Sequence, residues 1–241
     1  YSKEVLSIEP FVNCSYVINL INAVYLKNSE LINLRKFLKH VFKVSKSSII
    51  HISTASVYGA CNDKIISENS ICNPQNRYQK IKLEDEITLK NISTKFNCKC
   101  FILRPTEIFG NKGKNACKFI KSYFYSNVLK KYLMKSFFKD RKMHFVSSKY
   151  LIKTILRILD GKVEPGTYLT SNDDSKINSY FDFCKIIDSK KKLISKSEIF
   201  WSNLKILPLQ WVFKIFSKIF RSNQIPPNSK FISNKPIIES S

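Results

Sequence analysis

Three short apolar segments alternate with two helical patterns, and this alternation constrains the fold more than any other feature of the sequence. The segments cover residues 16–22 (YVINLIN), 48–53 (SIIHIS) and 100–105 (CFILRP), and polar residues bound each of them. Helical patterns fill the intervals, over residues 30–45 and 76–96. Strands that alternate with helices predict an α/β layer with a parallel sheet. Right-handed crossovers would place the carboxyl ends of all three strands at one edge, where α/β proteins bind their ligands.

Hydroxyl and amine side chains are predicted to meet at that edge. Ser53, Thr54 and Ser56 follow the second strand, and Tyr78 and Lys82 lie one turn apart on one face of the next helix. The ammonium of Lys82 would favour the phenolate and lower the pKa of Tyr78 from its usual value of about 10. The spacing Tyr-x-x-x-Lys also arises by chance as a solvated stripe on a helix. Its position after a strand that ends in Ser and Thr favours an acid/base pair.

The chain is strongly basic, with 41 Lys and Arg against 18 Asp and Glu, a formal net charge of +23. Such a balance can indicate nucleic-acid binding. The lysines are spread along the whole chain, however, and no nucleic-acid-binding motif is found. The abundance of Lys, Asn, Ile and Ser beside only five glycines is typical of drift toward A/T-rich codons. We therefore expect no nucleic-acid partner.

The seven cysteines form no CxxC pair and the three histidines are scattered, so the sequence predicts no metal site. Buried free thiols are the better interpretation, and they indicate a reducing compartment. No apolar run reaches the length of a membrane span, and no signal peptide opens the chain. We expect a cytoplasmic protein.

Three blocks of residues, in this order, resemble a known family. They are HISTASVYG (51–59), NRYQKIK (76–82) and FILRPTEIFG (101–110), and together they resemble the extended short-chain dehydrogenase/reductases, specifically the NAD-dependent epimerase/dehydratase family. A fainter similarity continues through residues 143–159 and 166–172. The resemblance implies a Rossmann-like parallel sheet with a small C-terminal substrate lobe.

The resemblance also implies a role for individual residues. Thr54 would hydrogen-bond the substrate at the reacting carbon, Tyr78 would be the acid/base, and Lys82 would hold the nicotinamide ribose. Other residues expected beside the cofactor are Asn22, Ala23, Arg104 and Pro105, and those expected beside the substrate are Ser56 and Glu107.

The activity implied is hydride transfer with NAD (or NADP) on a nucleotide sugar, with a homodimer allowed as the assembly. Dehydratases commonly carry an acidic pair after the Ser/Thr, and ISTASVYG has none. An epimerase or oxidoreductase is therefore favoured over a dehydratase. The alternative is a non-catalytic, degenerate paralogue or binding protein with a basic surface.

The chain departs from the family's pattern at its start. Members open with a glycine-rich turn that holds the pyrophosphate, whereas no glycine here precedes Gly59. The segment at 16–22 resembles the family's fourth strand, so we expect a sheet that lacks its first strands and interpret Tyr1 as the start of an N-terminally truncated sequence. Ile21 and Asn22 also stand where the family has two small residues.

Glu107 is a further departure from the family's pattern. It stands where sugar-nucleotide enzymes often carry Asn near the diphosphate. A carboxylate beside a phosphate is electrostatically unfavourable. This weakens the nucleotide-sugar assignment more than it weakens the fold.

Three parts are expected along the chain. Residues 1–110 would form a partial NAD(P)-binding Rossmann domain, residues 111–225 the remaining Rossmann elements interleaved with the substrate lobe, and residues 226–241 a flexible, Pro- and Ser-rich tail. Residues 118–138 predict an aromatic, basic helical stretch. Residues 207–224 predict an amphipathic helix that could lie on a membrane surface or, as we favour, pack within the substrate lobe.

Overall fold

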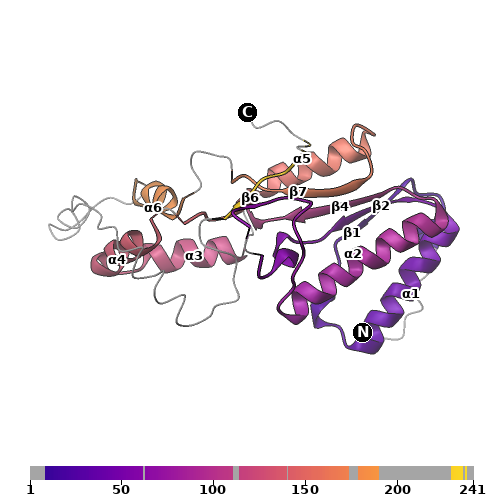
Figure 1. The fold of residues 1–241 in the computed structure, drawn as a ribbon, viewed down its shortest axis with the longest axis horizontal. Helices are drawn as coiled ribbons and strands as arrows, with labels where there is room; N and C mark the ends of the chain where they lie inside the picture. The colour runs from indigo at the N-terminus through magenta and orange to yellow at the C-terminus, as the bar shows by residue number, and fades with distance from the viewer. Residues whose placement is uncertain are drawn as a thin grey trace.

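The computed structural model describes residues 9–61, 63–110, 114–139, 141–173, 179–189, 229–235 and 237. Figure 1 shows an elongated molecule in which a body of sheet and helices is joined to a smaller lobe of helices. The predicted boundary near residue 110 falls between a short strand, β5 (Glu107–Phe109), and the first helix of that lobe, α3 (Lys114–Phe124).

Four parallel strands form the central sheet, in the order β1-β2-β4-β7. The strands are β1 (Tyr16–Asn19), β2 (Ser48–Ile52), β4 (Cys100–Pro105) and β7 (Gly166–Thr170). Ile50 of β2 pairs with Ile18 on one side and Phe101 on the other. The predicted parallel α/β sheet is therefore confirmed, and the carboxyl ends of its strands lie at one edge.

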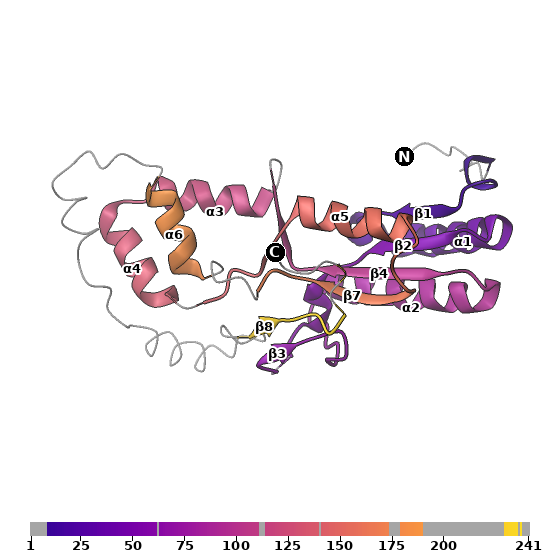
Figure 2. The same cartoon turned by 90° about the horizontal axis from the view of Figure 1, so that it is seen from above.

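Helices cover both faces of this sheet. The helices α1 (Asn28–Ser45) and α2 (Arg77–Phe96) lie on one face and α5 (Ser148–Leu159) on the other; in Figure 1, α5 lies above the sheet and α1 and α2 below it. Figure 2 shows the four strands side by side. Ile49 of β2 packs with α1 and α2, whereas its neighbour Ile50 packs with α5. This alternation follows from the period of two along a strand.

Local capping explains where the elements begin and end. Asn76 caps α2 by accepting a hydrogen bond from the Gln79 amide, and α2 ends at Asn97 in the left-handed conformation. The predicted first strand ends early, at Asn19, because residues Ala23–Tyr25 form a 3-10 turn (η2) that leads into α1. Two further 3-10 turns are η1 (Glu9–Phe11) and η3 (Ala55–Tyr58).

The smaller lobe consists of α3, α4 (Val128–Phe138) and α6 (Tyr180–Ser189) around a core of aromatic and apolar side chains. The predicted helical stretch over 118–138 is divided into two helices, since Asn127 caps α4 by accepting from the Lys130 amide. The strand β5 pairs in parallel with β6 (Phe145–Ser147) where the lobe meets the sheet.

The end of the chain returns to the body of the molecule. The strand β8 (Lys230–Phe231) pairs in parallel with β3 (Ile65–Ile66), and Phe231 is buried. A flexible tail over residues 226–241 is thus the wrong description of residues 229–235, because strand pairing and the buried ring hold them. The predicted helix over 207–224 lies outside the described residues.

Free thiols are found at Cys14, Cys61, Cys72, Cys98, Cys100 and Cys184, and three of these, Cys61, Cys100 and Cys184, are buried. Across the same part of the chain, no helix combines the length and the apolar character that crossing a bilayer requires.

Candidate functional site

The turn after β2 positions the first group of predicted site residues. Thr54 caps η3: its Oγ1 accepts a hydrogen bond from the Ser56 amide at 3.2 Å and lies 3.1 Å from the Ser56 Oγ. Gly59 ends this turn with φ 53°, and a Cβ there would lie 1.8 Å from the Asn73 carbonyl oxygen. Only glycine fits, which explains why the turn reads VYG.

Tyr78 lies in the first turn of α2, at the same edge of the sheet. It is half-buried, and burial raises the pKa of its phenol. A hydrogen bond with the Thr54 side chain lowers this pKa and the charge of Glu107 raises it. Tyr78 therefore lies within hydrogen-bond reach of Thr54 and electrostatic reach of Glu107, and a shared catalytic role for these residues stays a prediction.

Lys82 lies one turn further along α2 and is almost fully buried. Its Nζ donates hydrogen bonds to the carbonyl oxygens of Ile52 at 3.0 Å and Ile21 at 3.2 Å. Burial lowers the pKa of Lys82, opposed by the charges of Asp85 and Glu86. The ammonium thus bridges the carboxyl ends of two neighbouring strands.

The expected lowering of the Tyr78 pKa by Lys82 is not found. Burial raises that pKa instead, and the charge of Lys82 does not contribute to the shift. The reason is geometric, since the Lys82 ammonium is directed at the Ile21 and Ile52 carbonyl groups rather than at the phenol.

Arg104 belongs to a buried network beneath the site. Its Nη2 lies 2.7 Å from the Glu86 carboxylate, and its Nη1 donates to the Tyr58 hydroxyl at 3.0 Å. Ser53 donates to the same carboxylate. The resemblance implies that Arg104 lies beside the cofactor, and this stays a prediction. The guanidinium contacts Glu86 and Tyr58, because a buried cation requires a partner. Pro105, which ends β4, is also buried.

The remaining predicted cofactor residues lie at the end of β1. Asn22 is exposed and caps η2 by accepting from the Val24 amide at 3.4 Å. Ala23 is buried, and Ile21, whose carbonyl accepts from Lys82, has an exposed side chain. Their contact with a cofactor stays a prediction.

A cavity of about 420 Å³ lies between the β5-β6 pair and the helical lobe. Its polar lining includes Glu107, Arg141, Lys142 and His144. The apolar lining consists of Phe119, Phe138, Met143, Phe145 and Tyr180. The charge of Glu107, on this lining, raises the pKa of the Tyr78 phenol, so the cavity lies within electrostatic reach of the predicted acid/base residue.

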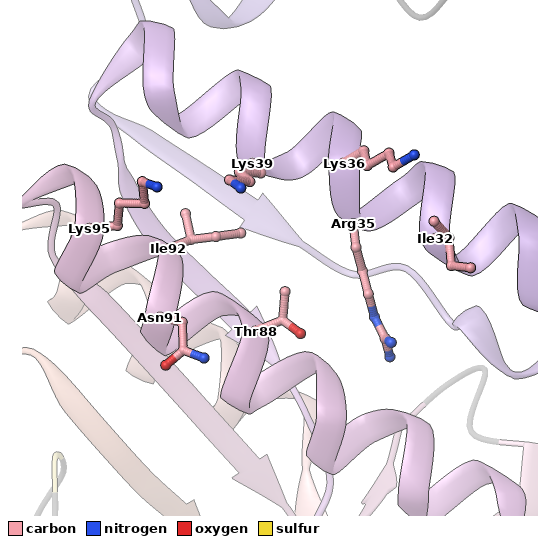
Figure 3. Close-up of a pocket in the computed structure, with 8 residues that line it drawn as sticks. All are labelled: Ile32, Arg35, Lys36, Lys39, Thr88, Asn91, Ile92 and Lys95. Atoms are coloured by element: carbon pink, nitrogen blue, oxygen red, sulfur yellow. The ribbon is translucent and has the colours of Figure 1, made fainter.

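A second hollow, between α1 and α2, contains none of the predicted site residues. Figure 3 shows its eight lining side chains, with Lys36 and Lys39 on α1 and Lys95 on α2. Its volume is about 380 Å³, and it borders the C-terminal half of α2, whereas Tyr78 and Lys82 lie in the N-terminal half. It is a basic groove outside the predicted site.

Three buried residues near the site escaped the sequence analysis. Glu86 follows Lys82 by four residues, as Lys82 follows Tyr78, so helical spacing alone could have placed it on the same face. No spacing pattern in the sequence pointed to Tyr58 as a residue of the site. Burial raises the pKa of its phenol to about 12.

His51 is the third, and it stands as a polar residue inside an apolar strand. Within the described residues neither of its ring nitrogens has a hydrogen-bond partner of standard geometry. The Asn19 backbone lies close enough to raise the pKa of His51 by hydrogen bonding, as the smallest of three effects. Burial, reinforced by the charge of Lys82, lowers the pKa of His51 to about 3.

One known protein family matches much of this chain. Residues 12–169 match the model of a family described as the NAD dependent epimerase/dehydratase family. No curated protein matches the sequence.

Solved structures share the fold. The UDP-glucuronic acid 4-epimerase from Bacillus cereus in complex with NAD is similar at a TM-score of 0.54 and 16% identity, over 94% of this chain and 66% of that one. A dTDP-4-dehydrorhamnose reductase from Clostridium acetobutylicum is similar at a TM-score of 0.55 and 21% identity, over 91% of this chain and 72% of that one. The UDP-glucose 4-epimerase from Thermotoga maritima with UDP-glucose is similar at a TM-score of 0.54 and 14% identity, over 86% of this chain and 78% of that one. The chain thus spans slightly less than two thirds of the first of these proteins.

Proposed function

Because the chain belongs to the NAD dependent epimerase/dehydratase family, we propose that it is an NAD-dependent epimerase or reductase that acts on a nucleotide sugar. One observation carries the proposal: the Thr54 side chain hydrogen-bonds the Tyr78 phenol at the carboxyl edge of the sheet, and the charge of Glu107, which lines the cavity, raises the pKa of the same phenol. The absence of an acidic pair in ISTASVYG again favours these activities over dehydration.

The donor set at this edge fits the nicotinamide end of NAD. A phenol, an ammonium and a hydroxyl group come from Tyr78, Lys82 and Thr54, and these groups suit a ribose and a reacting carbonyl. Tyr78 and Lys82 would hold the ribose, with Asn22 and Ala23 at the neighbouring strand end. When bound, NAD supplies the hydride acceptor and donor.

The chain's own residues supply proton transfer and orientation. In the direction of reduction the Tyr78 phenol would donate its proton to the carbonyl oxygen of the sugar as that oxygen becomes a hydroxyl, and in the reverse direction the resulting phenolate would take the hydroxyl proton back. Thr54 would donate to the same substrate oxygen and hold it beside the phenol. Lys82, fixed on the carbonyl groups of Ile21 and Ile52, keeps a positive charge at the edge.

The cavity supplies groups that suit a nucleotide sugar. Arg141 and Lys142 are cations that can bind phosphate oxygens. The rings of Phe119, Phe138 and Tyr180 offer apolar surfaces to a planar base. The aromatic and cationic lining supports a ligand that carries both a ring and a phosphate.

The substitution Tyr78→Phe tests the proposal. Removing the transferable proton should lower kcat about 100-fold or more while the circular dichroism spectrum stays unchanged. Turnover is followed by NADH absorbance for reduction and by chromatographic separation of the epimeric UDP- or dTDP-sugars for epimerisation. Tyr125→Phe, at a tyrosine 81% exposed in the helical lobe, is the matched control. Full activity of Tyr78→Phe would reject this role for the phenol.

Binding of NADH, followed by its fluorescence, separates the enzyme from the alternative of a non-catalytic protein. Saturable binding that Lys82→Met weakens and Lys80→Met leaves unchanged supports the enzyme. No binding at any concentration favours the degenerate paralogue.

A further inference from the structure

His144 and Asp173 form a pair on the wall of the cavity. The His144 Nδ1 lies 2.6 Å from the Asp173 Oδ2, and the same oxygen accepts the Phe231 amide at 3.0 Å. Asp173 is almost fully buried, while His144 is only partly buried and lines the cavity. A carboxylate can only accept hydrogen bonds, so the Nδ1 of His144 carries the hydrogen and Nε2 is the remaining ring nitrogen.

The imidazole is held in place from two further directions. The Phe231 ring packs edge-on against it, with the ring centroids 4.9 Å apart. The backbone of His144 has φ 51°, a left-handed conformation that few residues other than glycine adopt. Such strain is kept where the surrounding structure fixes a side chain for a purpose. Among the described residues, no partner for the His144 Nε2 is found.

Glu107 lies next to His144 on this wall. Its amide donates to the His144 carbonyl oxygen at 2.8 Å, and its side chain is exposed and lines the same cavity. The charge of Glu107 also reaches the Tyr78 phenol, whose pKa it raises. The Glu107 carboxylate, which accepts hydrogen bonds, and the His144 Nε2 thus lie together on the lining of the cavity.

Hydroxyl groups on neighbouring carbons of a sugar can each donate and accept hydrogen bonds, so they suit a carboxylate beside a ring nitrogen. A phosphate presents acceptors only, and beside a carboxylate it is disfavoured. We propose that Glu107 and His144, the latter held by Asp173, bind the hydroxyl groups of the sugar and orient the ring toward Tyr78, so that the pair selects hydroxyl-rich sugars. This inference rests on the proposed function, and it gives a role to the glutamate that stands where an asparagine is usual.

The test compares sugar nucleotides with the bare nucleotides by isothermal titration calorimetry. The probes are UDP-glucose and dTDP-glucose, with UDP and dTDP as comparators that lack the sugar. We expect Glu107→Gln to weaken binding of the sugar nucleotide about tenfold and to leave binding of the bare nucleotide unchanged, since only the sugar loses a charged acceptor. The matched control is Glu164→Gln, at an exposed glutamate in the loop before β7.

His144→Gln should have the same selective effect, with His40→Gln on α1 as its control. A thermal melt of each variant checks the fold, and the exposed position of Glu107 keeps the test valid if His144→Gln unfolds. Equal weakening of sugar nucleotide and nucleotide, or no weakening of either by Glu107→Gln, would overturn the inference and leave the proposed function standing. If the unaltered protein binds neither class of probe, the proposed function and this inference both fail.

Discussion

The Glu86 carboxylate lies 2.7 Å from the Arg104 Nη2, and both side chains are almost fully buried. The pair joins α2 to β4, and the same carboxylate accepts the hydroxyl of Ser53 at the end of β2. Arg104 also lies over the Tyr58 ring, 5.0 Å from its centroid. The Glu86 carboxylate therefore joins the helix that carries Tyr78 to β4 through an ion pair and to the strand end before Thr54 through a hydrogen bond.

We predict that Glu86→Gln strongly destabilises the fold, because it leaves the buried Arg104 cation without a charged partner. Removing one member of a buried pair costs about 3–5 kcal/mol of the free energy of unfolding. Urea unfolding measures this cost. The control Glu84→Gln removes an exposed partner of Arg35 and should cost less than about 1 kcal/mol. Equal losses in the two variants would show that burial of the pair does not matter.

Lys82→Met should lower kcat/KM about 100-fold or more. The change removes the ammonium that donates hydrogen bonds to the carbonyl oxygens of Ile21 and Ile52. It therefore also removes the cation next to the proposed ribose site. Lys82→Arg should not restore activity, because a planar guanidinium cannot occupy the position of the buried ammonium. Steady-state kinetics with Lys80→Met as control measure the effect, and an active Lys82→Met protein would remove Lys82 from the mechanism.

Stability should fall as the pH falls below 6.5, in part through His51. The folded pKa of His51 is lowered to about 3, so between pH 6.5 and 3 the unfolded chain binds a proton that the folded chain does not. Each pH unit in this window removes up to about 1.4 kcal/mol of the free energy of unfolding. The contribution of His51 to the free energy of unfolding is fully present above pH 6.5.

The variant His51→Leu should flatten this dependence, since it removes the buried imidazole. Urea unfolding of both proteins across the window measures the difference in slope, and His40→Leu, at an exposed histidine, is the control. Identical slopes for His51→Leu and the unaltered protein would show that His51 is protonated in the folded state.

Phe231→Ala should cost about 3–5 kcal/mol of the free energy of unfolding, because the ring is buried and lies against Tyr58 and His144. Chemical denaturation of this variant is compared with that of Lys235→Ala, which truncates an exposed side chain on the same segment. A cost below about 1 kcal/mol would mean that residues 229–235 are not needed to hold the fold.

The alternation of strands and helices could be predicted from the sequence, because it depends on the hydrophobic periodicity within short segments. The strand at Cys100–Pro105 has the predicted bounds, and the helix Arg77–Phe96 follows the predicted pattern with Asn76 as its cap. The same local spacing put Tyr78 and Lys82 on one helix face. Parallel pairing then brought their helix and the Thr54 turn to one edge.

What the sequence by itself determined is therefore the class of fold, the order of its elements and the position of Thr54 and Tyr78 at a shared edge. Only the tertiary structure decided what the polar side chains bind. Arg104 contacts Glu86, His144 contacts Asp173, and the tail strand pairs with Ile65–Ile66. These contacts join residues far apart along the chain, and burial decides them because a buried polar group must find a partner wherever the fold places one.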